Sequence, residues 1–160
     1  MVWVEIDRCV TDAIQAVTDC RLGRRTMKYL DFGKTAATFL NTDTNLAVRV
    51  AVLEESRQAA REFAPDAASE KEAQLIAYRA MSSKELFSVE PVIVEVPDWD
   101  RPGKPLSRIT CESCGEGVND KREVLEDGRY QCISCAYGAY YVPLGGSTTS
   151  YSSDAGANVA

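Results

Sequence analysis

Residues 111–135 read CESCGEGVNDKREVLEDGRYQCISC and contain two Cys-x-x-Cys pairs, Cys111 with Cys114 and Cys132 with Cys135. Two residues between the thiols of each pair allow one metal ion to bind both sulfurs in a tight knuckle. Four thiols in this arrangement predict a tetrahedral Zn²⁺ site. A rubredoxin-like iron site or a pair of redox thiols is the alternative interpretation.

The segment that joins the two pairs predicts a small treble-clef-like zinc ribbon. Gly115 directly follows the first pair, where the knuckle needs a residue that can adopt a positive φ. Residues 124–130 contain an Asp-Gly turn between short β-prone runs and predict a hairpin. Zinc held by four thiolates keeps no position open for water, so we expect it to stabilise the module, with partner binding or regulation as the alternative role.

Composition excludes several classes of function. The chain has 160 residues and no histidine, which excludes Ser-His-Asp and Cys-His catalysis and any histidine metal ligand. Its 18 Lys and Arg residues against 24 Asp and Glu residues give a net charge of -6. The region 108–141 is itself acidic, so we do not expect nucleic acid as a partner.

The start of the chain lacks the features of a secretory signal. Glu5, Asp7 and Arg8 interrupt the first apolar run, and no stretch reaches the ~20 apolar residues of a membrane span. We therefore expect a cytoplasmic protein with no membrane partner. In that compartment its six cysteines favour metal ligation or reactivity over disulfides.

Hydrophobic periodicity predicts a mixed α+β domain before the ribbon. The expected strands cover residues 2–6, 27–32, 35–40, 46–53 and 89–96, and the expected helices cover 9–20, 54–63 and 67–81. Ser82 and Glu85 have the spacing of a capping box, and Pro91 predicts an edge position for the last strand. The expected organisation is a domain at 1–96, a linker at 97–107, the zinc ribbon at 108–142 and a disordered tail at 143–160.

The remaining cysteines, Cys9 and Cys20, lie at the two ends of the first expected helix. Eleven residues at ~1.5 Å each place them about 16 Å apart, so they cannot share one metal within this helix. Both are either buried structural residues or reactive thiols. The reactive alternative is supported by the helix N-terminus at Cys9 and by the arginines that follow Cys20.

A series of motifs resembles the FmdE-like family of formylmethanofuran dehydrogenase subunits. The motifs are CVTDAIQAVTDC at 9–20, LGR at 22–24, DFGKTAATF at 31–39, LAVRV at 46–50 and AYR at 77–79. The resemblance extends over roughly residues 2–142 and implies an α+β domain, often dimeric, followed by an optional zinc ribbon. It also implies a link to the complex that fixes CO₂ onto methanofuran with a molybdenum or tungsten pterin.

This resemblance implies a site and a set of partners. By motif, a cleft that holds either a metal or a reactive group would be lined by Cys9, Asp12, Gln15, Cys20 and Lys34. A metal held there would be a second one beside the structural Zn²⁺. The implied protein is a homodimeric accessory subunit that works with oxidoreductase partner subunits and is non-catalytic alone. A zinc-ribbon adaptor or transcription-linked regulatory protein, and an enzyme that uses Cys9 or Cys20, are the alternatives.

The sequence departs from the family pattern in two places. Family members usually begin with a His-Gly-His-x-Cys-Pro-Gly segment, whereas this chain starts after that point, as expected of a truncated member. The loop 18–26 reads TDCRLGRRT where the family tends to have Thr-Gly-Cys-Thr-x-Gly-Lys-Gly-Asn. This loop opens the basic run 21–34, in which Arg24 and Arg25 are candidate ligands for an anionic cofactor, unless the run is simply a solvated face.

Overall fold

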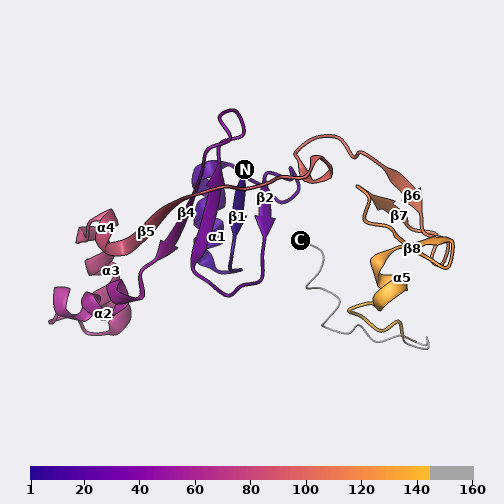
Figure 1. Ribbon diagram of the computed structural model, residues 1–160. Helices are drawn as coiled ribbons and strands as arrows, with labels where there is room; N and C mark the ends of the chain where they lie inside the picture. Colours follow the sequence, from indigo (N-terminus) through magenta and orange to yellow (C-terminus); the bar gives the residue numbers. More distant parts are fainter. Residues whose placement is uncertain (145–160) are drawn as a thin grey trace. The chain divides into compact units, whose positions relative to one another are not determined.

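The computed structural model describes residues 1–144, and the chain forms two compact units (Figure 1). The first unit is Met1–Glu95, and the second begins at Val96. Most of the tail expected at 143–160 lies outside the described residues. Within the part of the chain that the structure describes, no helix is both long enough and apolar enough to cross a membrane.

The first unit is a five-stranded sheet with helices, which confirms the predicted α+β class. Its elements are β1 (Val2–Val4), α1 (Cys9–Thr18), β2 (Met27–Tyr29), β3 (Ala36–Leu40), β4 (Ala47–Val52), α2 (Glu54–Phe63), α3 (Glu70–Ala80), α4 (Ser83–Leu86) and β5 (Phe87–Val92). The strand order is β2-β1-β3-β4-β5, with β1 parallel to β2 and the other pairs antiparallel.

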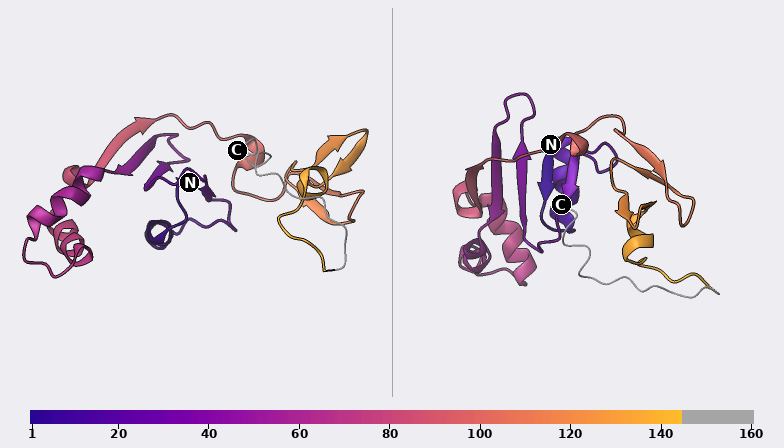
Figure 2. Two further views of the ribbon diagram at one scale, coloured as in Figure 1. Left: turned by 90° about the horizontal axis from the view of Figure 1, so that it is seen from below. Right: turned by 45° about the vertical axis from the view of Figure 1, so that its right-hand side comes forward.

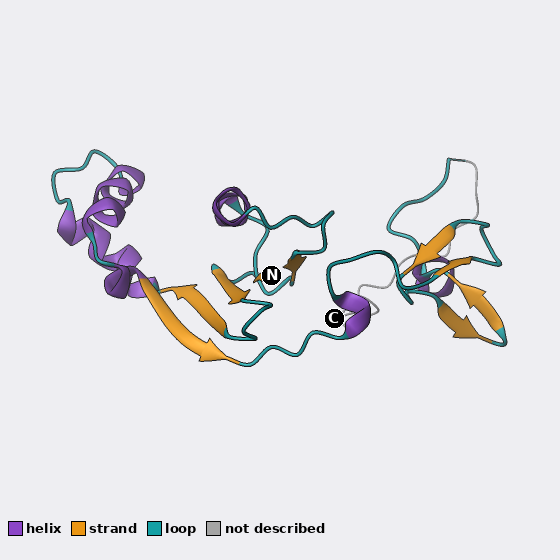
Figure 3. Cartoon of the chain, turned by 90° about the horizontal axis from the view of Figure 1, so that it is seen from above, coloured by secondary structure: helices purple, strands orange, loops and turns teal. Residues whose placement is uncertain are grey.

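Alternation along the strands gives the sheet one apolar face. Val2 and Val4 of β1 pair with Phe39 and Ala37 of β3, so these side chains lie on the same face. The buried core contains Val2 and Val4, and Ile14 of α1 packs against it. The amphipathic helix α1 therefore covers this part of the sheet, while α2 and α3 lie beyond the end of β4 (Figures 2 and 3).

The opposite face carries a buried ion pair. The carboxylate of Glu5, which is only 5% exposed, accepts two hydrogen bonds of 2.7 Å from Nε and Nη2 of Arg49 on β4. The hydrogen bond from Arg49 is the main cause that lowers the pKa of Glu5 below its usual 4.5. The pair therefore fixes the chain after β1 to strand β4.

Local signals explain where several elements begin and end. The capping box at Ser82 and Glu85 is present, and Pro91 lies on β5, which is an edge strand as predicted. The helix predicted to begin at residue 67 begins instead at Glu70. The reason is that the Ser69 hydroxyl accepts a hydrogen bond from the Glu72 N–H, which fixes the N-terminus of α3 there.

The second unit consists of two small hairpins and a short helix. Its elements are the 3-10 helix η1 (Asp98–Asp100), β6 (Arg108–Thr110), β7 (Gly117–Asn119), β8 (Val124–Glu126), β9 (Arg129–Gln131) and α5 (Ile133–Tyr137). β6 pairs with β7 and β8 pairs with β9, both antiparallel. The predicted Asp-Gly turn joins β8 to β9, with φ of 50° at Asp127 and 78° at Gly128.

Candidate metal centre and N-terminal site

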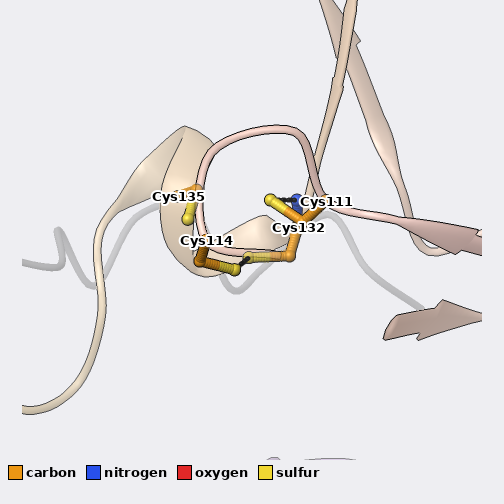
Figure 4. Close-up of side chains that lie close together, drawn as sticks. All are labelled: Cys111, Cys114, Cys132 and Cys135. Atoms are coloured by element: carbon orange, nitrogen blue, oxygen red, sulfur yellow. Dashed lines mark hydrogen bonds between the residues drawn. The ribbon is translucent and has the colours of Figure 1, made fainter. Parts of the chain in front are cut away.

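The four cysteines of the second unit form one cluster. Cys111 and Cys114 lie in the connection between β6 and β7, whereas Cys132 and Cys135 lie at the start of α5. Their four sulfur atoms all lie within 4.8 Å of one another (Figure 4). Two segments that are separated in the sequence thus supply one set of four thiol ligands.

Backbone hydrogen bonds shape both knuckles. In the first, the Gly115 N–H donates to the Cys111 carbonyl oxygen at 2.9 Å, and Gly115 adopts the predicted positive φ, 78°. In the second, the Cys135 N–H donates to the Cys132 carbonyl oxygen at 3.0 Å. The Cys132 N–H also donates to Sγ of Cys111 at 3.2 Å, which links the two knuckles through a sulfur ligand.

The electrostatics of the cluster favour a bound cation. Backbone N–H groups, first that of Cys114 and then that of Cys132, lower the pKa of Cys111 to about 6. The neighbouring Cys132 thiol and then burial raise the pKa of Cys135. The Cys111 thiol therefore ionises readily, whereas the Cys135 thiol resists adding a further negative charge. A dication removes this conflict because it neutralises the thiolates.

The geometry fits tetrahedral zinc. Zn–S bonds of about 2.3 Å place sulfur atoms about 3.8 Å apart in a tetrahedron. Sγ of Cys114 and Sγ of Cys132 are 3.9 Å apart. Four thiolates would fill every coordination position, so the site is suited to holding the fold together rather than to activating water.

The candidate residues on α1 do not gather around one point. Cys9 and Asp12 are exposed, Gln15 is half-buried, and Cys20, beyond the end of the helix, packs against the apolar core. Among the described residues, the zinc cysteines are the only group of three or more potential metal ligands that lie close together. The first unit thus brings Cys9, Asp12 and Cys20 into no comparable cluster.

The arginines after α1 are held in an ion-paired loop. Asp19 adopts a left-handed conformation, and its carboxylate pairs with Arg24 at 2.8 Å and with Arg21 at 3.1 Å. Arg25 is half-buried and also has a positive φ, 60°. The carboxylate of Asp19 therefore compensates part of the positive charge of this loop.

Lys34 contributes to a cavity that none of the candidate residues on α1 lines. It lines a cavity of about 570 Å³ together with Arg49 of β4, Arg57 of α2, and Gln74 and Tyr78 of α3. Sequence reasoning missed this grouping, although the Ala77-Tyr78-Arg79 motif pointed to one of its residues. No periodic signal marks Arg57 or Gln74, because both lie on polar helix faces that read as solvent-exposed.

Two known proteins resemble the chain over most of its length. The crystal structure of a tungsten formylmethanofuran dehydrogenase FmdE-like protein from Syntrophus aciditrophicus has a TM-score of 0.58. It is 20% identical in sequence, and the alignment covers 88% of this chain and 73% of that one, so it supports the fold. A probable S-adenosyl-L-methionine-binding protein of Archaeoglobus fulgidus is 29% identical over 89% of this chain. The chain spans only 42% of that relative's length.

The two units match two described families. Residues 105–141, which contain the four cysteines, match the prokaryotic dksA/traR C4-type zinc finger. Residues 1–90, more than half of the chain, match the family described as FmdE, molybdenum formylmethanofuran dehydrogenase operon. The match covers most of the first unit and includes the motifs at 9–50 and 77–79, so the chain belongs to the FmdE family, with a C4 zinc finger after the family domain.

Proposed function

We propose that this chain is an accessory subunit of a formylmethanofuran dehydrogenase-like oxidoreductase and is non-catalytic alone. In this role it serves molybdenum- or tungsten-dependent one-carbon metabolism in the cytoplasm, together with oxidoreductase partner subunits. The observation that carries the proposal is the family domain at residues 1–90 joined to a zinc finger.

Two features of the chain support the non-catalytic role. The four thiols fill the coordination sphere of zinc, so a substrate or water has no metal position to occupy. Cys9 and Cys20 flank opposite ends of α1, and the described part of the chain supplies them with no third ligand. A second metal at these cysteines would need ligands from outside the described residues.

The edge of the sheet supports the homodimer. β5 is an edge strand whose side chains are mostly exposed, and Val89 is 62% exposed. The backbone groups of this edge strand before Pro91 can pair with a strand of a second copy. Dimerisation there would cover Val89.

The test is purification of the tagged full chain from its native cells without chelator. Recovery of oxidoreductase subunits together with molybdenum or tungsten supports the accessory role, and the matched control is the Cys111→Ser/Cys114→Ser variant. Recovery of transcription proteins without either metal would instead favour the adaptor function, which the match at 105–141 keeps as second candidate.

The metal content of the chain alone should be one zinc. A second metal that disappears in a Cys9→Ser/Cys20→Ser variant would show that the N-terminal cleft binds metal.

A further inference from the structure

The cavity beside Lys34 is walled by the sheet and by the α2–α3 pair of helices. It has a volume of about 570 Å³, within the ~300–1,000 Å³ of typical small-molecule sites. Lys34 belongs to the loop before β3, Arg49 to β4, and Arg57 to α2. Residues from three separate segments therefore contribute positive charge to one cavity.

The lining of the cavity is positively charged within an acidic protein. Lys34, Arg49 and Arg57 line it, and Glu54 is the one acidic residue of the lining. Glu5 engages Arg49 in the bidentate ion pair, so two further cations, Lys34 and Arg57, face the charge of Glu54. Among the lining residues the balance stays positive, with three cations and one carboxylate, while Glu5 and Glu90 of β5 act on Arg49 from outside the lining.

Several hydrogen-bond donors at this cavity lack a protein partner. Among the residues that the structure describes, the side chains of Arg57, Gln74 and Tyr78 make no hydrogen bond or ion pair. Arg49 uses one N–H of Nε and one of Nη2 for Glu5, which leaves the two N–H groups of Nη1 and one of Nη2. Gln74 and Tyr78 are half-buried, so their donors are partly removed from water.

The remaining wall is apolar. Ala36, Ala51 and Val52 line the cavity from β3 and β4. Small side chains at these positions leave room for a compact body against the sheet. A ligand that combines an anionic group with an apolar or planar part would match both halves of the lining.

We propose that this cavity binds a small organic anion. Lys34 and Arg57 hold its carboxylate or phosphate, Tyr78 and Gln74 donate hydrogen bonds to it, and its body packs against Ala51. The ion pair with Glu5 positions Arg49 at the wall. This site goes beyond the proposed accessory role and does not depend on any partner subunit.

The test is an NMR titration of the isolated full chain with two probes, inorganic phosphate and benzoate. We expect saturable chemical-shift changes at 33–36, 49–57 and 74–78, with millimolar affinity for at least one probe. Saturation with phosphate alone would indicate a phosphate ligand, and saturation with benzoate alone a carboxylate ligand. In Lys34→Gln and Arg57→Gln the dissociation constant should rise about fivefold or more, as expected for loss of a charge-assisted contact.

The matched control is Arg79→Gln, which removes an exposed charge one residue from Tyr78 but outside the cavity lining. Its dissociation constant should stay within about twofold of the unmodified chain, since only the general field changes. Tyr78→Phe keeps the ring, so the fold survives, and it should weaken binding through loss of the hydroxyl. Equal weakening by Arg79→Gln, shifts that map to the loop 18–26, or no saturation with either probe would overturn the proposal. Each of those results leaves the purification test of the accessory role unaffected.

Discussion

The two units of this chain are stabilised by different means. The first buries apolar side chains of three neighbouring strands, including Val2, Val4 and Met27, and adds the ion pair of Glu5 with Arg49. Among the described residues of the second unit, the fully buried apolar side chain belongs to Cys111. A module with so little core depends on its metal, whereas the first unit does not.

Replacement of one zinc ligand should break the second unit and spare the first. Structural zinc contributes about 10 kcal/mol or more of apparent binding free energy, which exceeds what two short hairpins supply. We expect Cys111→Ser to lose zinc and to unfold residues 106–142, as seen by elemental analysis and by collapse of their dispersed NMR signals. The signals of Met1–Glu95 should keep their positions.

Cys9→Ser is the control for this experiment, since it removes an exposed thiol outside the cluster. Zinc content and both sets of signals should remain unchanged. A chelator should reproduce the effect of Cys111→Ser, and added zinc should reverse it. Persistence of the folded second unit without metal would contradict the comparison between the units.

Acid should lower the free energy of unfolding of the first unit, because it protonates Glu5. The pKa of this carboxyl is lowered in the folded chain below 4.5, mainly by the hydrogen bond from Arg49. The unfolded chain therefore binds more protons between the two pKa values, so the stabilisation is complete above pH 4.5 and is lost as the pH falls through the folded pKa. Glu5→Gln should cost about 2 kcal/mol near neutral pH and should reduce this acid dependence.

Fluorescence can follow this unit separately, because the chain has two tryptophans, Trp3 in β1 and Trp99 in η1. In a Trp99→Phe background, urea unfolding monitored at Trp3 reports the free energy of unfolding of the first unit at each pH. Glu95→Gln, which changes an exposed carboxylate, should leave that pH profile in place. An unchanged profile in Glu5→Gln would show that the ion pair adds nothing.

Features set by short stretches of sequence were predictable. The spacing of four cysteines predicted the zinc cluster, and Ser82 with Glu85 predicted the cap that the structure contains. Alternating valines likewise predicted β4, and Pro91 predicted an edge strand. In each case the information lies within a few residues, because a knuckle, a cap and a strand face are local structures.

The cavity was not predictable in this way. Lys34 comes from a loop, Arg57 from α2 and Tyr78 from α3, and only the path of the chain after β4 brings them to one space. The same holds for Glu5 and Arg49, which are 44 residues apart in the sequence. They meet because β1, which ends just before Glu5, and β4, which contains Arg49, both lie beside β3. Sequence periodicity reports the face of an element and not which elements become neighbours.

The smallest expected effect compares one glycine in each unit. Gly33 and Gly115 have φ of 63° and 78°, and a Cβ at either position would meet no atom within 4 Å. Alanine at each site therefore costs about 1 kcal/mol of backbone strain and nothing in packing.

In Gly33→Ala this cost should appear as a lower free energy of unfolding of the first unit. In Gly115→Ala it should appear as about fivefold weaker zinc affinity in a chelator competition, since folding and metal binding are one equilibrium there. Zinc affinity in Gly33→Ala should match that of the unmodified chain, and a shift in it would mean that the two units are energetically coupled.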